Sequence, residues 1–101
     1  MTRGKLILTW DIAPKHEQEY FEFVVREFLP KVQKMGFEVN DAWVTVYGDQ
    51  PQILVAAVMP SMQKIEQTIH TETWQKLLNK LMDFVENFNY KIVPANSSFQ
   101  F

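Results

Sequence analysis

Apolar and polar positions in this sequence follow the strand period in some segments and the helix period in others. The clearest segment is residues 53–59, seven apolar residues in a row between Pro51 and Pro60. Seven residues is a typical strand length, and an unbroken apolar strand is covered on both faces because its side chains alternate in direction. The run therefore predicts a central strand of a sheet.

Other segments also alternate with the period of a strand, and each is bounded by turn residues. They are residues 5–12, 38–47 and 90–93. The cluster from Gly48 to Pro51 has the length of a hairpin turn, so residues 38–47 are expected to run antiparallel to residues 53–59. The strand at 90–93 is expected to stop at Pro94.

Residues 16–35 predict an amphipathic helix that ends at Gly36. Its apolar residues recur at intervals of three and four, and they are Phe21, Val24, Val25, Phe28, Val32 and Met35. Pro30 lies inside this helix, where its ring removes a backbone hydrogen bond. We therefore expect a kink at Leu29–Pro30.

A second helical region follows the central strand. Ser61 is expected to cap a short helix, and Thr71 to cap a longer one that ends near Asn87 and Asn89. The short helix contains Met62, Ile65 and Ile69, and the longer one contains Trp74, Leu78, Leu81, Val85 and Phe88 at steps of four and three. This longer stripe is the strongest helical pattern in the chain.

The order strand, helix, strand, strand, helix, strand predicts one ferredoxin-like α+β domain over residues 1–101. Right-handed crossovers give an antiparallel four-stranded sheet of order 4-1-3-2, with both helices on one face. The opposite face is also apolar, through some set of Ile7, Trp43 or Val44, Leu54 or Val55, and Val58. Because soluble monomers rarely expose so large an apolar patch, we expect a homodimer that packs sheet against sheet.

The end of the sequence leaves two alternatives open. Phe99 and Phe101 follow a polar stretch, and they either anchor in the partner subunit or belong to a free end.

Composition narrows the choice of partners and compartments. Ten basic and 12 acidic residues give a net charge of −2, which provides no electrostatic reason to expect nucleic acid or an anionic membrane as a partner. The apolar segment that follows Lys5 is too short for a signal peptide or a membrane span. The absence of cysteine fits a reducing compartment, so the expected location is the cytoplasm.

Two motifs and the order of elements resemble a known superfamily over nearly the whole chain. They are Leu-Pro-Lys-Val-Gln-Lys-Met-Gly-Phe at residues 29–37, and His-Thr-Glu-Thr-Trp at residues 70–74 with apolar residues after it. They are similar to the dimeric α+β barrel proteins, which include antibiotic-biosynthesis monooxygenase-like, NIPSNAP-like and stress-responsive A/B barrel proteins. The resemblance implies a ferredoxin-like fold and a dimer. It implies no single activity, because members include cofactor-independent oxidases, haem-degrading enzymes and proteins without known activity.

His70 and Trp74 are the candidate catalytic residues. If one helix contains both, they face the same space, and His70 is placed as a general base or a haem ligand. The alternative places His70 half-exposed at a helix junction. The resemblance to haem-degrading members implies an asparagine on the first strand, but this chain has Thr9 and Trp10 there. We therefore expect no cofactor.

A set of aromatic and amide side chains has the residue types that orient a planar ligand, as in the oxidase-like relatives. The candidate ligand-binding residues are Trp10, Tyr20, Asn40, Trp43 and Tyr47. The structural alternative is that the tryptophans pack in a core or a dimer interface, and that Asn40 forms a turn.

The remaining polar candidates predict no metal site. The two histidines, His16 and His70, are far apart in sequence, so a metal site needs carboxylates from several loops. Asp11 follows the first strand and lies either at a pocket mouth or in a solvated turn.

Two functions therefore remain as alternatives. One is a pocket between sheet and helices that binds or oxidises a small planar apolar compound. The other is a non-catalytic domain for assembly or partner binding. A cavity of a few hundred cubic ångströms beside His70 and Trp74 favours the first function, and tight packing there favours the second.

Overall fold

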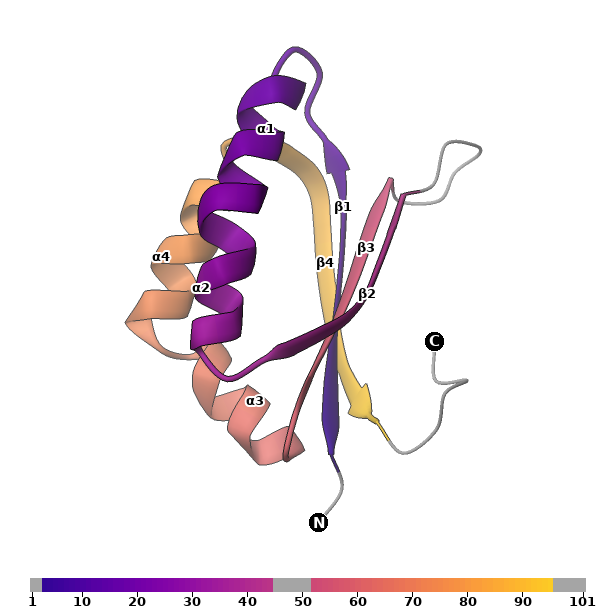
Figure 1. Ribbon diagram of the computed structural model, residues 1–101, viewed down its shortest axis with the longest axis vertical. Helices are drawn as coiled ribbons and strands as arrows, with labels where there is room; N and C mark the ends of the chain where they lie inside the picture. The colour runs from indigo at the N-terminus through magenta and orange to yellow at the C-terminus, as the bar shows by residue number, and fades with distance from the viewer. Residues whose placement is uncertain (1–2, 45–51, 96–101) are drawn as a thin grey trace.

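A computed structural model describes residues 3–44 and 52–95 of the chain. It has a layer of helices on one face of an antiparallel sheet (Figure 1). The strands are β1 (Gly4–Ile12), β2 (Glu38–Val44), β3 (Ile53–Met59) and β4 (Val85–Pro94), in the order β2-β3-β1-β4. This order is the predicted 4-1-3-2 arrangement read from the other edge, so the expected ferredoxin-like α+β fold is confirmed.

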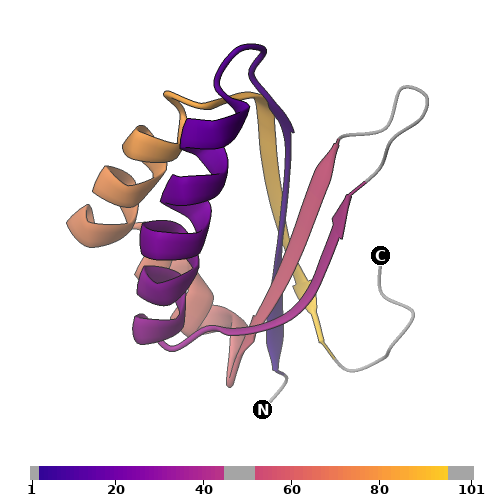
Figure 2. The same ribbon diagram turned by 45° about the horizontal axis from the view of Figure 1, so that its top comes forward.

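The helical layer begins with one long helix in three parts. These are α1 (Glu17–Phe23), a π-helical segment (Val24–Phe28) and α2 (Leu29–Lys34). After β3 come α3 (Met62–Ile69) and α4 (Glu72–Leu81). Figure 2 shows that all of these helices cover the same face of the sheet. In the part of the chain that is described, no helix is long and apolar enough to cross a membrane.

The irregularity expected at Pro30 lies one turn earlier, in the π-helical segment. The amide of Leu29 donates to the carbonyl of Val24, five residues back. A proline has no N–H to donate, so a regular helix would leave one backbone carbonyl without its donor at Pro30. The wider turn directly before Pro30 changes the pairing of the backbone carbonyls there. The first helix therefore passes Pro30 through a π-bulge, a type of helix irregularity that is often found at functional sites.

The π-bulge also changes which side chains of the first helix are buried. The predicted apolar stripe is wrong at Phe21 and Val25, which are 51% and 64% exposed. Tyr20 is buried instead, while Phe28 and Val32 are buried as predicted, because one extra residue in the turn rotates the residues after the bulge relative to those before it. The core therefore receives a phenol hydroxyl that the period of three and four did not predict.

The second helix is shorter than predicted, because α4 ends at Leu81 and the chain turns at Met82–Phe84. Val85 and Phe88 belong to β4, where a bulge sets Asn87 and Phe88 opposite the single residue Trp10. Residues three apart in a regular strand face opposite sides, but a bulge between them returns both to one side. The spacing of Val85 and Phe88 therefore matches that of a helix, although both side chains reach the core from the sheet.

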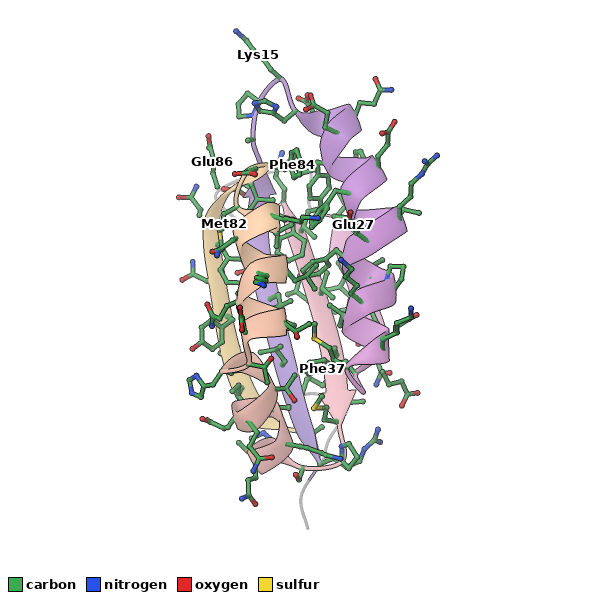
Figure 3. The ribbon with its side chains drawn as sticks, turned by 90° about the vertical axis from the view of Figure 1, so that its left-hand side faces the viewer. Lys15, Glu27, Phe37, Met82, Phe84 and Glu86 are labelled. Carbon is green, nitrogen blue, oxygen red and sulfur yellow. The ribbon has the colours of Figure 1, made fainter. Side chains whose placement is uncertain are left out.

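The core lies between the helices and the sheet, and aromatic rings fill its centre. Trp10 is fully buried, and its ring centroid lies 5.8 Å from that of Phe28 and 6.2 Å from that of Phe88. Phe37 enters at the other end of the core, 5.7 Å from Trp74. Figure 3 looks onto the helical layer, with Phe37 and Phe84 labelled. Over the helices, Lys80 of α4 pairs with Glu27 of the π-helical segment at 3.1 Å.

The start of β1 passes close to α3 at Gly4, and this contact leads to a prediction. A Cβ atom on Gly4 would lie 2.7 Å from Cδ1 of Ile65 and 2.9 Å from Cα of Met62. The Met62 atom in this contact belongs to the backbone, so it cannot rotate away from the added Cβ. Gly4→Ala is therefore expected to push α3 away and to cost about 1–3 kcal/mol of unfolding free energy. Urea unfolding followed by circular dichroism measures this loss. Thr9→Ala, on the outer face of the same strand, is the control, and an equal loss in both variants would contradict the close contact.

Candidate functional site

The space beside His70 and Trp74 is a groove at the edge of the sheet. It lies between the junction of α3 and α4 and the edge strand β4, and its volume is about 70 Å³. Its lining residues are Ile69, His70, Trp74, Gln75, Leu78, Phe88 and Tyr90. A cavity of a few hundred cubic ångströms, which would favour an enclosed ligand pocket, is not found at this place. The groove is also smaller than the ~150 Å³ of an engineered cavity that holds benzene.

His70 and Trp74 reach the groove from different elements. The short helix α3 ends at Ile69, and His70 follows it as an exposed residue with φ −95°. Thr71 caps α4 by accepting a hydrogen bond from the backbone N–H of Trp74 at 3.3 Å. The two residues are therefore not on one helix. His70 lies at the helix junction, which was the structural alternative, while the indole of Trp74 is 2% exposed.

Polar groups form the rim of the groove and apolar groups its floor. The side-chain amide of Gln75 donates from Nε2 to the carbonyl of Ile69 at 2.9 Å, which fixes the amide in place. His70 and the phenol of Tyr90 are exposed on the same rim, with Tyr90 55% exposed. Trp74 and Phe88 lie deeper. The groove can therefore take the apolar edge of a small molecule and offer hydrogen bonds to its outer part.

Trp10 and Tyr20 belong to the core and not to the groove. Nε1 of Trp10 donates to the hydroxyl of Tyr20 at 2.9 Å, and both side chains are at most 2% exposed. Burial raises the pKa of the Tyr20 phenol, and the hydrogen bond from Trp10 opposes part of that rise. The structure thus places these two candidate ligand-binding residues in the core, where neighbouring aromatic rings fill the space around them.

Asn40 and Trp43 also lie away from the groove, on the opposite edge strand β2. Asn40 is the extra residue of a β-bulge, since its neighbours Val39 and Asp41 pair with adjacent residues of β3, and it is exposed. Trp43 pairs with Leu54 on the face of the sheet away from the helices and is 50% exposed. The candidate ligand-binding residue Tyr47 lies outside the described residues, as do Phe99 and Phe101.

Sequence reasoning found His70 and Trp74 but missed five residues of the groove. Leu78 follows Trp74 by one helical turn, and this spacing predicts a shared face. Tyr90 and Phe88 gave no such signal, because Phe88 matched a helical period and Tyr90 was placed only as the start of a strand. The residues of β4 are brought to the groove by the bulge at Asn87.

Asp11 ties the ends of three strands together. Its Oδ1 accepts from the backbone N–H of Gln52 at 2.9 Å, and its Oδ2 accepts from Nδ2 of Asn87 at 2.9 Å. In return, Oε1 of Gln52 accepts from the backbone N–H of Ile12 at 2.7 Å. These hydrogen bonds give Asp11 a structural role at one end of the sheet. Asp11 lies within β1, and not in a turn after it.

The two hydrogen bonds to Asp11 predict a pH dependence of stability. The bond from Asn87, followed by the bond from the Gln52 backbone, lowers the pKa of the Asp11 carboxyl below its ordinary value. A carboxylate with a lowered pKa in the folded state stabilises the fold above its unfolded pKa, and this contribution is lost as the pH falls through the folded pKa.

The measurement compares melting temperatures of the wild type and Asp11→Asn between pH 7 and about pH 2. The wild type is expected to melt higher at neutral pH, and the difference should disappear at acid pH. Asp83→Asn, in the turn after α4, serves as the control. A difference that persists at the acid end would show that the charge of Asp11 is not its source.

No metal site is found among the residues that the structure describes. No group of three or more histidine, aspartate or glutamate side chains is placed there to hold an ion. His16 lies at the start of α1, exposed, with Nδ1 3.6 Å from a carboxylate oxygen of Glu19. The groove does not fit haem either, because a porphyrin ring is several times larger than a space of about 70 Å³.

No protein-family model and no curated protein matches the sequence. Solved structures do match. A NIPSNAP family protein from Agrobacterium tumefaciens superposes with a TM-score of 0.72 at 17% identity, over 98% of this chain and 90% of that one. An ethyl tert-butyl ether d (ethd) family protein from Bacillus halodurans gives a TM-score of 0.70 at 15% identity, over 90% of this chain and 96% of that one.

A third match is a conserved protein of unknown function from Bacteroides thetaiotaomicron, described as a possible oxidoreductase. It gives a TM-score of 0.66 at 6% identity, over 92% of this chain and 97% of that one. Identities this low establish the fold and not the activity. The chain therefore has the fold of the NIPSNAP family proteins, which confirms at the level of fold the resemblance found in the sequence.

Proposed function

We propose that this protein binds a small, mostly apolar compound at the groove between α4 and β4. The observation that carries the proposal is the composition of the groove, with Trp74 and Phe88 as its floor and His70, Gln75 and Tyr90 at its rim. Ligand sites in proteins combine an apolar surface with a few placed polar groups in this way. The volume of about 70 Å³ limits the buried part of the ligand to one edge of a ring or a short chain.

Indole and phenol are suitable probes for this site, and NMR is the measurement. The chain has three tryptophans, so each indole N–H gives a separate signal. We expect the Trp74 signal to shift during titration while the Trp43 signal stays in place. Gln75→Ala and His70→Ala should weaken the binding several-fold, and Lys76→Ala, exposed on the same helix, should not. Shifts of all three signals together, or of none, would contradict the proposal.

A narrower form of the proposal is cofactor-independent oxidation of the bound compound. His70 supports it, because an imidazole at the rim of the groove can accept a proton from a ligand hydroxyl. The description of one structural relative as a possible oxidoreductase is a reason to measure oxygen consumption with catechol-type probes. Consumption that His70→Ala abolishes supports oxidation, and probe binding without consumption leaves a binding protein.

We further propose that the protein forms a homodimer through the face of the sheet away from the helices. Trp43 supports this, since it places a half-exposed indole on that face beside Leu54. Buried aromatic side chains are the usual anchors of protein interfaces. If assembly or partner binding is the whole function, which is the alternative to ligand binding, this face is where it acts.

Light scattering coupled to size exclusion tests the dimer. We expect twice the chain mass at micromolar concentration, and the single-chain mass for Trp43→Ser. Phe21→Ser is the matched control, because Phe21 is exposed to the same extent on α1. A single-chain mass for the wild type would rule the dimer out.

A further inference from the structure

Another groove lies on the helical layer, between α2 and α4, and we refer to it as the lysine groove. Its lining residues are Lys31, Thr73, Lys76, Leu77 and Lys80, and its volume is about 260 Å³. Figure 3 looks onto this layer, with Glu27 labelled beside α4. The volume exceeds the ~150 Å³ of an engineered cavity that holds benzene. The lysine groove therefore has room for a small molecule.

The lysine groove and the groove at β4 lie on different faces of α4. The four residues that α4 contributes to the lysine groove are spaced by three and four, so they share one face of the helix. The lining of the groove at β4 includes none of them. A ligand in the lysine groove therefore does not contact the residues that line the groove at β4.

Ammonium groups dominate the lysine groove. Three of its lining side chains are lysines, and none of its lining side chains is acidic. Nζ of Lys31 and Nζ of Lys80 lie 3.8 Å and 3.1 Å from the same carboxylate oxygen of Glu27. Nζ of Lys76 lies 3.1 Å from Glu72 of its own helix. Three positive charges therefore share two carboxylates, and the local balance is positive although the whole chain has a net charge of −2.

These ion pairs leave donors available in the lysine groove. Each ammonium group has three N–H donors, and the side chains of all three lysines are at least half exposed. Lys76 and Lys80 are also one helical turn apart, where like charges disfavour the helix. An anion placed between these ammonium groups would relieve that repulsion.

We propose that the lysine groove binds a small anion with several oxygen atoms, of the phosphate or phosphate-ester class. Lysine binds phosphate as a point charge, without one required geometry. Thr73 adds a hydroxyl donor in the first turn of α4, where the helix dipole favours negative charge. Leu77, 3% exposed, forms the floor. This inference goes beyond the proposed function, because the face of α4 and the class of ligand are both different.

Calorimetric titration with pyrophosphate, in a phosphate-free buffer of low ionic strength, tests the proposal. We expect saturable binding that weakens as salt is added. Lys31→Gln with Lys76→Gln should weaken it about tenfold or more, because two charge-assisted contacts are lost. This double variant keeps the pair between Lys80 and Glu27, which favours an intact helical layer.

Lys34→Gln with Lys64→Gln is the matched control. Both lysines are exposed on helices outside the lysine groove, and the control removes the same amount of charge from the chain. It should change the affinity by less than about twofold, since distant exposed charges are screened. An equal loss of affinity in the two double variants, or no saturable binding by the wild type, would overturn the proposal.

Glu27→Gln is expected to have the opposite effect. The hydrogen bond from Lys80 is the main cause that holds the pKa of the Glu27 carboxyl below its ordinary value. The charged carboxylate therefore competes with a bound anion for Lys31 and Lys80. Neutral glutamine should tighten pyrophosphate binding several-fold, and weaker binding by this variant would contradict the assignment of these two lysines.

NMR locates the bound pyrophosphate. The backbone amide signals of Thr73, Lys76 and Lys80 should shift during the titration, while those of Phe88 and Tyr90 stay in place. Larger shifts at Phe88 and Tyr90 would place the anion in the groove at β4 and overturn the proposal.

A phosphate group can belong to a free compound or to a lipid headgroup, and sedimentation with vesicles that contain phosphatidic acid distinguishes the two. Pyrophosphate binding without cosedimentation identifies a free phosphate compound as the ligand. Cosedimentation that Lys31→Gln with Lys76→Gln abolishes identifies a headgroup in the same groove.

Discussion

Trp10→Ala is expected to lower the free energy of unfolding by about 3–5 kcal/mol, the range for removing a large buried aromatic side chain. The side chain is fully buried and lies among the rings of Tyr20, Phe28 and Phe88. It also donates the hydrogen bond to the Tyr20 hydroxyl, whose loss leaves a buried polar group without that partner. For a domain of this size, the melting temperature should fall by roughly 15 °C or more.

Urea unfolding measured by far-ultraviolet circular dichroism gives this loss, and Trp10→Phe separates its two causes. Phenylalanine keeps most of the ring contacts but has no N–H, so its cost should be nearer the 1–3 kcal/mol of an unsatisfied buried hydroxyl. Trp43→Ala removes the same side chain from a half-exposed position and should cost less than either. If Trp10→Ala cost under about 1 kcal/mol, the aromatic cluster would not be the centre of the core.

Sequence patterns predicted best those elements whose apolar residues repeat with the period of the element and are buried in the structure. The run at residues 53–59 and the alternation at residues 5–12 gave β3 and β1 at the centre of the sheet, because buried strands need apolar residues in register with their neighbours. The order of elements then fixed the topology through the handedness of the crossovers. The fold followed from these steps without reference to any particular side-chain contact.

The errors in the faces and bounds of elements occur where one extra residue interrupts a regular period. A π-bulge at Val24–Phe28 moved Phe21 and Val25 to the surface, and a β-bulge at Asn87 gave β4 the spacing of a helix. Such an insertion satisfies its hydrogen bonds locally, so the residue pattern on either side shows no break. The prediction of the candidate site was affected most, because the groove lies where the bulged strand β4 meets the helices.

The placement of tryptophans was the second limit on prediction. Three tryptophans with similar apolar neighbours proved to have three environments, in the core, on the outer face and beside the groove. Periodicity assigns a side chain to a face, but which face is covered by helices depends on the whole topology. The candidate pocket therefore combined residues that the structure places on both sides of the sheet.

Trp74→Ala is expected to cost about 3–5 kcal/mol of unfolding free energy as well, even though Trp74 lines the groove. Its indole is 2% exposed and packs beside Phe37, so most of its surface faces the core. His70, exposed on the rim of the same groove, makes the matched comparison, and His70→Ala should change the stability by no more than about 0.5 kcal/mol. The two variants thus separate the supporting floor of the groove from its accessible rim.

Trp74→Phe extends this argument from stability to function. Phenylalanine preserves the contact with Phe37 in part and keeps the protein folded, so probe binding can be measured in a stable variant. If the groove binds its ligand through the indole, Trp74→Phe weakens indole and phenol binding several-fold while circular dichroism stays unchanged. If Trp74→Ala were tolerated within 1 kcal/mol, the side chain would be held for its ligand and not for packing, and the division between floor and rim would be wrong.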